Sequence, residues 1–241
     1  MQSPDDLRSR RDAVARLWGM SRGAVLLPGG LPVPVPGTDQ YHDFHAHPEF
    51  SYLSGAGIPG SALAFDPGEG WVRFAPVAGL EERVWVGDGE DLEALAAATG
   101  LRVRPLGELL GWLERRRGEV LALLGNDDIT HHPAAYGIEG WPALELDVDA
   151  ELSARLSEQV SESRRAKDSS EIALMRSAAG TSRAGHLAAL RLARPGMSER
   201  QLQIELEAEF FRHGAERTAY GSIVGTGSNG AVLHFSPTSR A

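Results

Sequence analysis

The sequence contains no cysteine and only one lysine, Lys167, among its 241 residues. The lack of cysteine excludes disulfide bonds, thiolate catalysis and zinc sites built on cysteine. Any chemistry must therefore use histidine, carboxylate or hydroxyl side chains, or a metal ion. No apolar run reaches the roughly 18 residues that a transmembrane helix needs, and the first residues lack the apolar segment of a secretory signal. These absences predict a cytoplasmic protein that does not insert into a membrane.

Acidic residues outnumber basic ones by 33 to 24, which gives a net charge of −9. A surface that binds nucleic acid or an anionic membrane needs a basic patch, so this balance argues against both kinds of partner. The hydrophobic fraction of 42% is ordinary for a globular protein. A chain of this length forms either one large domain or one domain with part of another.

The first part of the chain alternates between short apolar runs and turns rich in Gly and Pro. Ser3 and Pro4 predict a helix start, and this helix should end near Gly19. Five strands are predicted next, at residues 23–27, 49–53, 61–65, 71–75 and 83–86. Two helices, around residues 92–96 and 106–113, then alternate with strands at 101–104 and 119–124. This pattern predicts an α/β domain over residues 1–150, with turn-rich residues 126–142 before the boundary.

Two helices with clear start signals open the second part, residues 151–241. Asp168 with Glu171, and Ser198 with Gln201, each form a capping box at a helix start. An apolar stripe on the first helix includes His186, which this position predicts to be a core histidine. The sole lysine, Lys167, precedes the first of these helices. Because a cation opposes the dipole at a helix start, we expect Lys167 to have a specific acidic or carbonyl partner.

The last segment, residues 220–235, has the pattern of a hairpin. Two apolar runs, at residues 220–224 and 231–235, flank a Gly-rich link that ends in Asn229-Gly230, a strong hairpin signal. The predicted strands carry Tyr220 and His234. The link lacks the lysine and following helix of a phosphate-binding loop. The loop length leaves the register open by one residue, so the pattern does not fix which way Tyr220 faces.

The run Tyr-Gly-Ser-Ile-Val-Gly-x-Gly-x-Asn-Gly-x-Val-Leu-His-Phe at residues 220–235 resembles the first hairpin of the catalytic domain of aminopeptidase P, one of the pita-bread metallopeptidases. The Arg-Pro-Gly-Met-Ser-Glu turn at 194–199 is also similar to that family. Residues 48–55 and 83–87 resemble segments of its N-terminal domain. The resemblance implies an aminopeptidase-P-like N-terminal domain over 1–150, with a mixed sheet and helices. Residues 151–241 then form the incomplete start of an α+β pita-bread domain.

The resemblance also implies an activity and its cofactors. Such enzymes are Xaa-Pro aminopeptidases, which remove an N-terminal residue preceding proline with the help of two divalent cations, often manganese, with zinc or cobalt as alternatives. The family's metal ligands follow the matched hairpin, so we expect none in this chain, no catalytic metal pair and no activity from the chain alone. The catalytic half would then be the remainder of the protein or a second chain. The resemblance further implies a homodimer or homotetramer.

Three residues receive roles from the resemblance. His234 would stabilise charge on the reacting carbonyl as a catalytic residue. Tyr220 would line the substrate pocket, and Trp85 would reach the substrate site of a neighbouring subunit. Read without the family, His234 is a packed or surface histidine, Tyr220 covers a hairpin and Trp85 is an ordinary strand aromatic. Two other functions stay open: an Xaa-Pro dipeptidase (prolidase), and a non-catalytic binding module of the same fold.

His45 and His47 have a spacing that would place two imidazoles on one face of a strand, which is compatible with a metal site. Pro48 follows directly, and no acidic residue stands at a matching spacing. We therefore expect a surface pair rather than a metal site, with a role in shaping the substrate entrance as the alternative. Other rivals are weaker still. A Ser-His-Asp hydrolase, for example, lacks its Gly-x-Ser-x-Gly motif here.

Overall fold

The computed structural model describes residues 2–55, 57–125 and 147–239. The chain forms two compact units, Met1–Lys167 and Asp168–Ala241. The boundary predicted near residue 150 precedes helix α6 (Ala150–Ser163), whose buried side chains pack in the core of the first unit. The compact units therefore divide after α6 rather than before it. The turn-rich stretch predicted at residues 126–142 lies outside the described residues.

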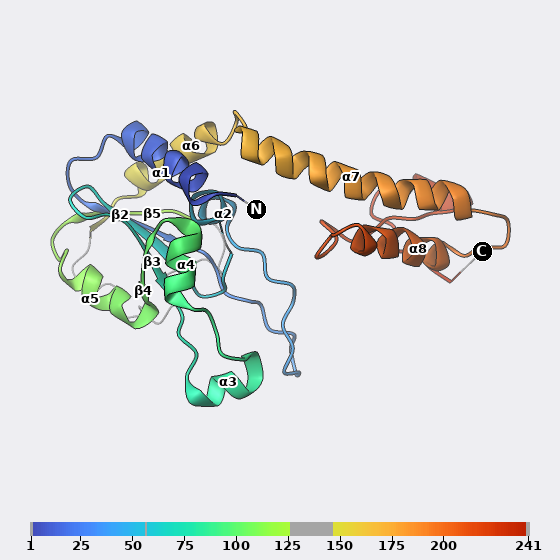
Figure 1. The fold of residues 1–241 in the computed structure, drawn as a ribbon, viewed down its shortest axis with the longest axis horizontal. Coiled ribbons are helices and arrows are strands. Elements are labelled where there is room, and N and C mark those ends of the chain that lie inside the picture. The colour runs from blue at the N-terminus through green and yellow to red at the C-terminus, as the bar shows by residue number, and fades with distance from the viewer. Residues whose placement is uncertain (1, 56, 126–146, 240–241) are drawn as a thin grey trace. The chain divides into compact units, whose positions relative to one another are not determined.

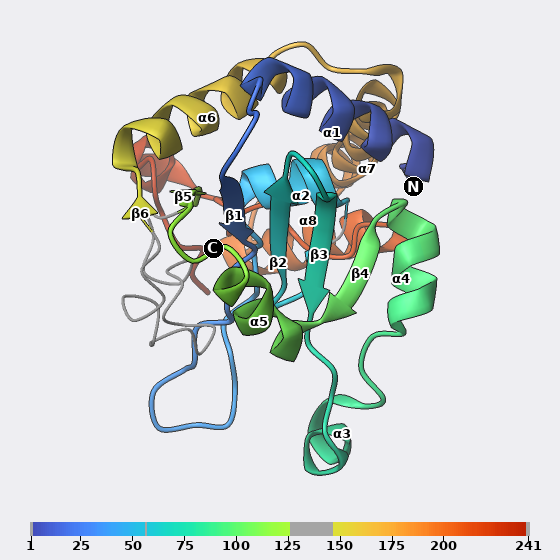
Figure 2. The ribbon, with the colours of Figure 1, turned by 90° about the vertical axis from the view of Figure 1, so that its left-hand side faces the viewer.

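The first unit is built on a mixed sheet (Figure 2). Its described strands are β1 (Ala24–Pro28), β2 (Ala62–Asp66), β3 (Gly70–Ala75), β4 (Arg102–Pro105), β5 (Val120–Leu123) and β6 (Asp147–Val148). They lie in the order β4-β3-β2-β1-β5-β6. β2 pairs antiparallel with β1 and β3, and the other neighbours pair in parallel. This arrangement confirms the predicted α/β class with a mixed sheet.

Helices cover both faces of this sheet (Figures 1 and 2). Helices α1 (Pro4–Trp18), α2 (Pro48–Ser54) and α6 pack on one face, where the ring of Trp18 packs against those of Phe65 and Trp71. A 3-10 turn, η1 (Leu106–Glu108), and helix α5 (Leu109–Glu114) cover the other face, where Trp112 meets Phe74 edge to face. Helix α4 (Leu92–Thr99) lies beside β4. The predicted caps of α1 are confirmed, with Ser3 at its start and Gly19 at its end.

Two predicted strands are helices in the structure. Residues 49–53 belong to α2, because Pro48 sets the first helical turn and the buried Phe50 and Leu53 lie on one helical face. Residues 83–86 belong to helix α3 (Leu80–Val86), which stands away from the sheet (Figures 1 and 2). β2 and β4 occupy both edges of β3, so the segment after β3 has no neighbouring strand to pair with there. The aromatic and β-branched residues of both segments favoured strands by propensity, and tertiary context overrode it.

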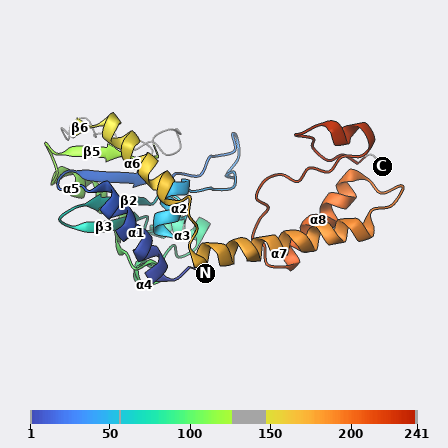
Figure 3. The same cartoon turned by 90° about the horizontal axis from the view of Figure 1, so that it is seen from above.

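The second unit contains two helices that lie side by side, α7 (Ser169–Leu192) and α8 (Glu199–Arg212) (Figure 3). Both predicted capping boxes are present, at Asp168 with Glu171 and at Ser198 with Gln201. After α8 the chain continues without regular structure to a short 3-10 helix, η5 (Gly227–Ala231). Within the described ranges, none of the helices combines the length and the apolar character needed to cross a bilayer.

The predicted hairpin is wrong: residues 220–224 and 231–235 form no strand in the structure, and η5 lies between them. A lone two-stranded hairpin is marginally stable unless a further strand or a helix packs against it. No strand of the second unit lies beside these residues in the described part of the chain. Side-chain contacts to one buried carboxylate, on Glu199, hold this segment instead.

Candidate functional site

A cavity of about 520 Å³ opens between α7, α8 and the segment that follows α8. Its apolar wall comes from Leu206 and Phe210 of α8 and from Ile223 of the segment. Polar groups from α7, including Thr181 and His186, complete the lining. A mostly apolar hollow with a few converging polar groups is the usual form of a small-ligand site.

The approach of the two helices that frame this cavity depends on Gly185. A Cβ atom at Gly185 would overlap the ring of Phe210 and lie 2.8 Å from the carbonyl oxygen of Leu206. The adjacent His186 ring meets Phe210 edge to face, with centroids 6.5 Å apart. Thr181 Oγ1 also donates to the carbonyl of His213, at 3.0 Å. His186 is exposed, so the prediction that it is a core histidine is wrong.

Of the predicted site residues, Tyr220 lines this cavity and is 76% exposed. His234 is also exposed, in the turn after η5, and it does not line the cavity. The strand pair that was expected to bring the two residues together is absent. The structure therefore places both predicted residues at the surface of the second unit, on different parts of its last segment.

Glu199, the first residue of α8, was not singled out in the sequence, where it only ends the family-like turn at 194–199. It is fully buried, and its carboxylate accepts five hydrogen bonds from three residues. Oε1 accepts from Thr226 N at 2.9 Å, from Thr226 Oγ1 at 3.2 Å and from Asn229 Nδ2 at 2.8 Å. Oε2 accepts from Thr238 N at 3.0 Å and Thr238 Oγ1 at 2.7 Å.

These donors determine the charge of Glu199. The hydrogen bond from Asn229 lowers its pKa, burial raises it, and the bonds from Thr226 and Thr238 lower it further, with the pKa at about 2 as the result. A carboxylate that accepts several such bonds stays ionised at neutral pH. In the sequence, the helix dipole alone accounts for an acidic residue directly after the N-cap Ser198, because a negative charge is favoured at a helix start. Only the fold reveals what it binds.

Trp85 lies in the first unit, on α3, and is 79% exposed. Leu80 and Val84 on the same helix are each 84% exposed. Such a cluster of large apolar side chains in solvent is unusual for a monomer surface and typical of an interaction site.

The two histidines at 45 and 47 do not act as a pair. His45 is exposed, whereas His47 is the N-cap residue of α2 and its backbone donates to the carbonyl of Gly29 at 2.9 Å. The strand on which they were placed is not formed. Among the described residues, no group of three or more His, Asp or Glu side chains could hold a metal ion.

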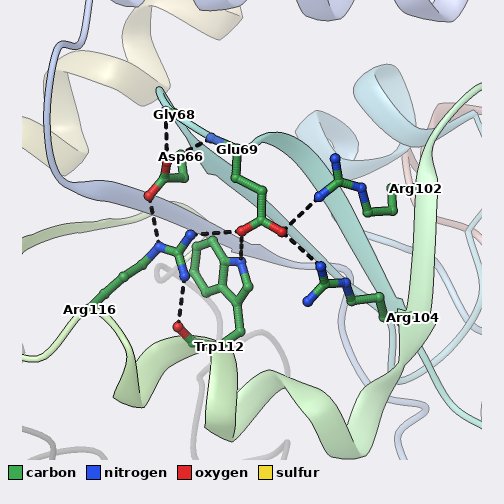
Figure 4. A network of polar contacts seen from close by, with 7 residues as sticks. All are labelled: Asp66, Gly68, Glu69, Arg102, Arg104, Trp112 and Arg116. Atoms are coloured by element: carbon green, nitrogen blue, oxygen red, sulfur yellow. Dashed lines mark hydrogen bonds and ion pairs between the residues drawn. The ribbon is translucent and has the colours of Figure 1, made fainter.

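A polar network at the β2–β3 turn of the first unit was missed in the sequence (Figure 4). Glu69 accepts at Oε1 from Arg102 and Arg104, at 2.8 and 2.9 Å. It accepts at Oε2 from Trp112 Nε1 and Arg116, both at 2.8 Å. Both carboxylate oxygens are therefore already bonded twice. Glu69 ties the turn to β4 and α5, and is not available as a general base or a metal ligand.

Asp66 completes this network. It accepts from Arg116 Nε at 2.9 Å and from the backbone N–H groups of Gly68 and Glu69 (Figure 4). The Arg116 guanidinium lies 3.5 Å from the centroid of the Trp112 ring and is 9% exposed. The arrangement is a structural brace.

Two parts of the sequence match known families. Residues 7–120 match the family described as "Aminopeptidase P, N-terminal domain", and residues 173–241 match "Metallopeptidase family M24". The chain belongs to the aminopeptidase P family of metallopeptidases. This confirms the resemblance seen in the sequence, in both parts and in the same order along the chain.

Curated relatives of this chain are named Xaa-Pro aminopeptidases. A "Probable Xaa-Pro aminopeptidase" of Talaromyces stipitatus is 30% identical over 232 residues, which cover 92% of this chain and 43% of that protein. The "Xaa-Pro aminopeptidase" of Escherichia coli is 27% identical over 252 residues, which cover 97% of this chain and 55% of that protein. The chain spans about half the length of the curated relatives it matches.

Solved structures of the same family have a similar fold. The low-pH form of aminopeptidase P from E. coli matches with a TM-score of 0.79 and 25% identity, over 98% of this chain and 56% of that chain. "Proline aminopeptidase P II from Yersinia pestis" matches with a TM-score of 0.77 and 26% identity, over 98% of this chain and 56% of that chain. Another match is described as "Zn substituted E. coli Aminopeptidase P in complex with product".

Proposed function

We propose that the protein acts as an Xaa-Pro aminopeptidase, which hydrolyses the bond between an N-terminal residue and a following proline. The observation that carries the proposal is that an aminopeptidase P N-terminal domain and the start of an M24 metallopeptidase domain follow one another in one chain. An Xaa-Pro bond has no N–H at its nitrogen, and the proline ring fixes φ, so general peptidases handle it poorly. Its hydrolysis therefore needs a dedicated pocket.

The described residues do not fit a catalytic metal centre, since they offer no cluster of three or more ligating side chains. We place the ligands of the proposed pair of divalent cations, manganese first and zinc or cobalt as alternatives, in the part of the relatives' length that this chain does not span. The part that supplies them is either the remainder of the protein or a second chain.

Within this activity His234 donates a hydrogen bond to the oxygen of the reacting carbonyl and stabilises the charge that develops there. Its exposed position leaves the imidazole accessible from solvent. Tyr220 lines the substrate site, which its place on the cavity wall supports.

Trp85 contributes to the substrate site of a neighbouring subunit in a homodimer or homotetramer. The exposed apolar surface of α3, formed by Leu80, Val84 and Trp85, supports this role because burial against a second copy removes it from water. A substitution of all three by serine should shift the molecular mass in solution, measured by light scattering, toward that of a monomer. An unchanged mass would contradict the assignment.

The activity is tested on the purified protein together with the part that supplies the metal ligands, with manganese and a set of short peptides. Release of arginine from Arg-Pro-Pro, with no release from Arg-Ala-Ala, is the expected result. Cleavage of the dipeptide Arg-Pro alone would instead indicate a prolidase. Intact-mass measurement of the same sample shows whether a second polypeptide is present. Failure to cleave any Xaa-Pro substrate, in a sample that retains metal, would overturn the proposal.

A further inference from the structure

The last segment of the chain is closed into a loop by one carboxylate. Thr226 and Thr238 stand twelve residues apart in sequence, and both donate to Glu199. His234 lies between them, four residues before Thr238. We propose that Glu199 is a positioning residue, which closes residues 226–238 into a loop and thereby holds His234 in place. The loop closure stands on its own, and the consequence for catalysis rests on the proposed function.

Each of the two carboxylate oxygens of Glu199 binds one end of the loop. Oε1 accepts from Thr226 and Asn229 at the first end, and Oε2 accepts from Thr238 at the second. Each end therefore depends on the other through a single side chain. Compact loops of about 6–16 residues whose ends meet in this way are often functional.

The residue next to Glu199 strengthens the second end. Arg200 donates from its backbone N–H to the carbonyl of Thr238 at 2.9 Å, and from its guanidinium to the carbonyl of Pro237 at 2.8 Å. Both backbone groups of Thr238 are thus bonded to the first turn of α8. Because α8 begins with the capping box of Ser198, this anchor is itself fixed in space.

A carboxylate is the only common side chain that satisfies this arrangement. All five hydrogens point at Glu199, so an amide at this position would direct its own N–H groups at other donors. Glu199 is fully buried, so water cannot easily replace a lost bond. Asp is shorter by one methylene and cannot reach both ends. We therefore expect neither Gln nor Asp to restore the loop.

His234 depends on the loop because little else holds it. Its side chain is exposed, and within the described residues its ring makes no hydrogen bond to the protein. Of its two neighbours, Leu233 is 85% exposed and Phe235 is half-buried. The position of the imidazole thus depends on the backbone between Thr226 and Thr238.

The first test needs no activity. In Glu199→Gln, the amide hydrogens of Thr226 and Thr238 should exchange with solvent about tenfold faster or more. The NMR signals of the His234 imidazole should move toward those of an unstructured peptide, while those of His213 in the same unit stay in place. The exposed Glu216→Gln, which changes the charge equally, is the matched control and should change neither. Unchanged exchange with unmoved His234 signals would overturn the proposal.

A milder pair of variants covers the case in which Glu199→Gln does not fold. Thr238→Val removes one donor to Oε2 while preserving side-chain shape, and Thr238→Ser keeps that donor. The valine variant should reproduce the faster exchange and the His234 shift, and the serine variant should restore both. Equal behaviour of the two variants would contradict the proposal.

The second test uses turnover of an Xaa-Pro peptide by the metal-loaded protein. Glu199→Gln should lower kcat about tenfold or more, with KM and metal content nearly unchanged. Because Glu199 acts through His234, the double variant with His234→Ala should be no slower than His234→Ala alone. Additive losses would show that Glu199 acts through general stability and would overturn the positioning role. A wild-type protein without activity would count against the proposed function, and the exchange and NMR results would still decide on the loop.

Discussion

Lys167, the sole lysine of the chain, donates hydrogen bonds from its ammonium group to the backbone carbonyl of Arg164 at 2.7 Å and to that of Arg165 at 3.0 Å. These carbonyls lie at the C-terminal end of α6, where a cation is favoured by the helix dipole. The carbonyl partner expected from the sequence is confirmed. The ammonium group of Lys167 thus binds the end of α6, the helix that precedes it in the chain.

Replacing Lys167 should therefore change the free energy of unfolding by a measurable amount. Lys167→Met removes both bonds and should lower the free energy of unfolding by about 0.3–1 kcal/mol, as for other exposed cations at a helix end. Lys167→Arg should recover only part of this, because a planar guanidinium does not reproduce a point donor shared by two carbonyls. Urea unfolding measures the change, with the exposed Arg22→Met as control. A stability equal to wild type in both Lys167 variants would show that these bonds contribute nothing.

The brace around Glu69 should contribute to stability in a pH-dependent way. Burial raises the pKa of Glu69, but the hydrogen bonds from Trp112 and Arg116 and the charge of Arg104 outweigh it, so the pKa lies below the ordinary 4.5. A group whose folded pKa is depressed stabilises the fold above its unfolded pKa, and this stabilisation is lost as pH falls through the folded pKa.

Glu69→Gln should accordingly lower the free energy of unfolding by about 1.5–3 kcal/mol at pH 7, the usual range for hydrogen bonds to a charged group. The difference from wild type should shrink as pH falls below 4.5. The exposed Glu114→Gln on α5 is the matched control and should have little effect at any pH. A difference that stays constant down to pH 2 would contradict an ionic origin.

Arg73 in β3 is a buried charge with few partners. It is fully buried, lies over the ring of Phe50 and donates from Nη2 to Ser61 Oγ at 3.2 Å. Its Nε and Nη1 atoms have no hydrogen-bond partner within the described residues. Burial lowers its pKa to about 10, which reflects the cost of keeping the guanidinium charged there.

Replacing this charge by an apolar side chain of similar volume should stabilise the first unit. We expect Arg73→Leu to raise the free energy of unfolding by about 1–4 kcal/mol, as when a buried ionic group is replaced by a packed apolar one. Arg73→Ala is the companion variant, and the cavity it leaves should reduce this gain. Thermal unfolding of the two variants and of the wild-type protein measures these differences in stability. A leucine variant less stable than wild type would show that Arg73 has a stabilising partner.

The close contact of α7 and α8 predicts opposite effects for two glycine substitutions on α7. Gly185→Ala should lower the free energy of unfolding by about 1–3 kcal/mol, because its Cβ overlaps Phe210 and forces the two helices apart. Gly180→Ala meets no atom within 4 Å and should raise that free energy by about 0.5–1 kcal/mol through helix propensity. Changes of the same sign in both variants would contradict the packing seen at Gly185.

His234→Ala tests the catalytic role directly in the metal-loaded protein. Loss of one hydrogen bond to a developing oxyanion should lower kcat by about a hundredfold to a thousandfold. Metal content, measured by mass spectrometry, should stay near wild type because no coordination bond is removed. A variant that loses its metal ions would identify His234 as a ligand, and wild-type turnover would remove it from the mechanism.

The sequence by itself determined the elements whose signals are local. Capping boxes at Ser198 and Asp168 marked helix starts correctly because their hydrogen bonds join residues three apart. The α/β class followed from apolar periodicity, and the long motif at residues 220–235 indicated the family, whose resemblance implied the mixed sheet. The need for a partner at Lys167 also followed from its position directly before a helix start.

Only the tertiary structure decided features that depend on distant neighbours. Residues 49–53 and 83–86 have strand propensity, yet both form helices outside the described sheet, the first of them with Pro48 in its first turn. The segment with His234 has no described strand beside it, so its predicted hairpin did not form. Glu199 was visible as an acidic residue at a helix start, but its five donors come from residues 27 to 39 positions away. Local pattern carries no information on contacts at that separation, because loop closure brings the ends together only when the whole unit folds.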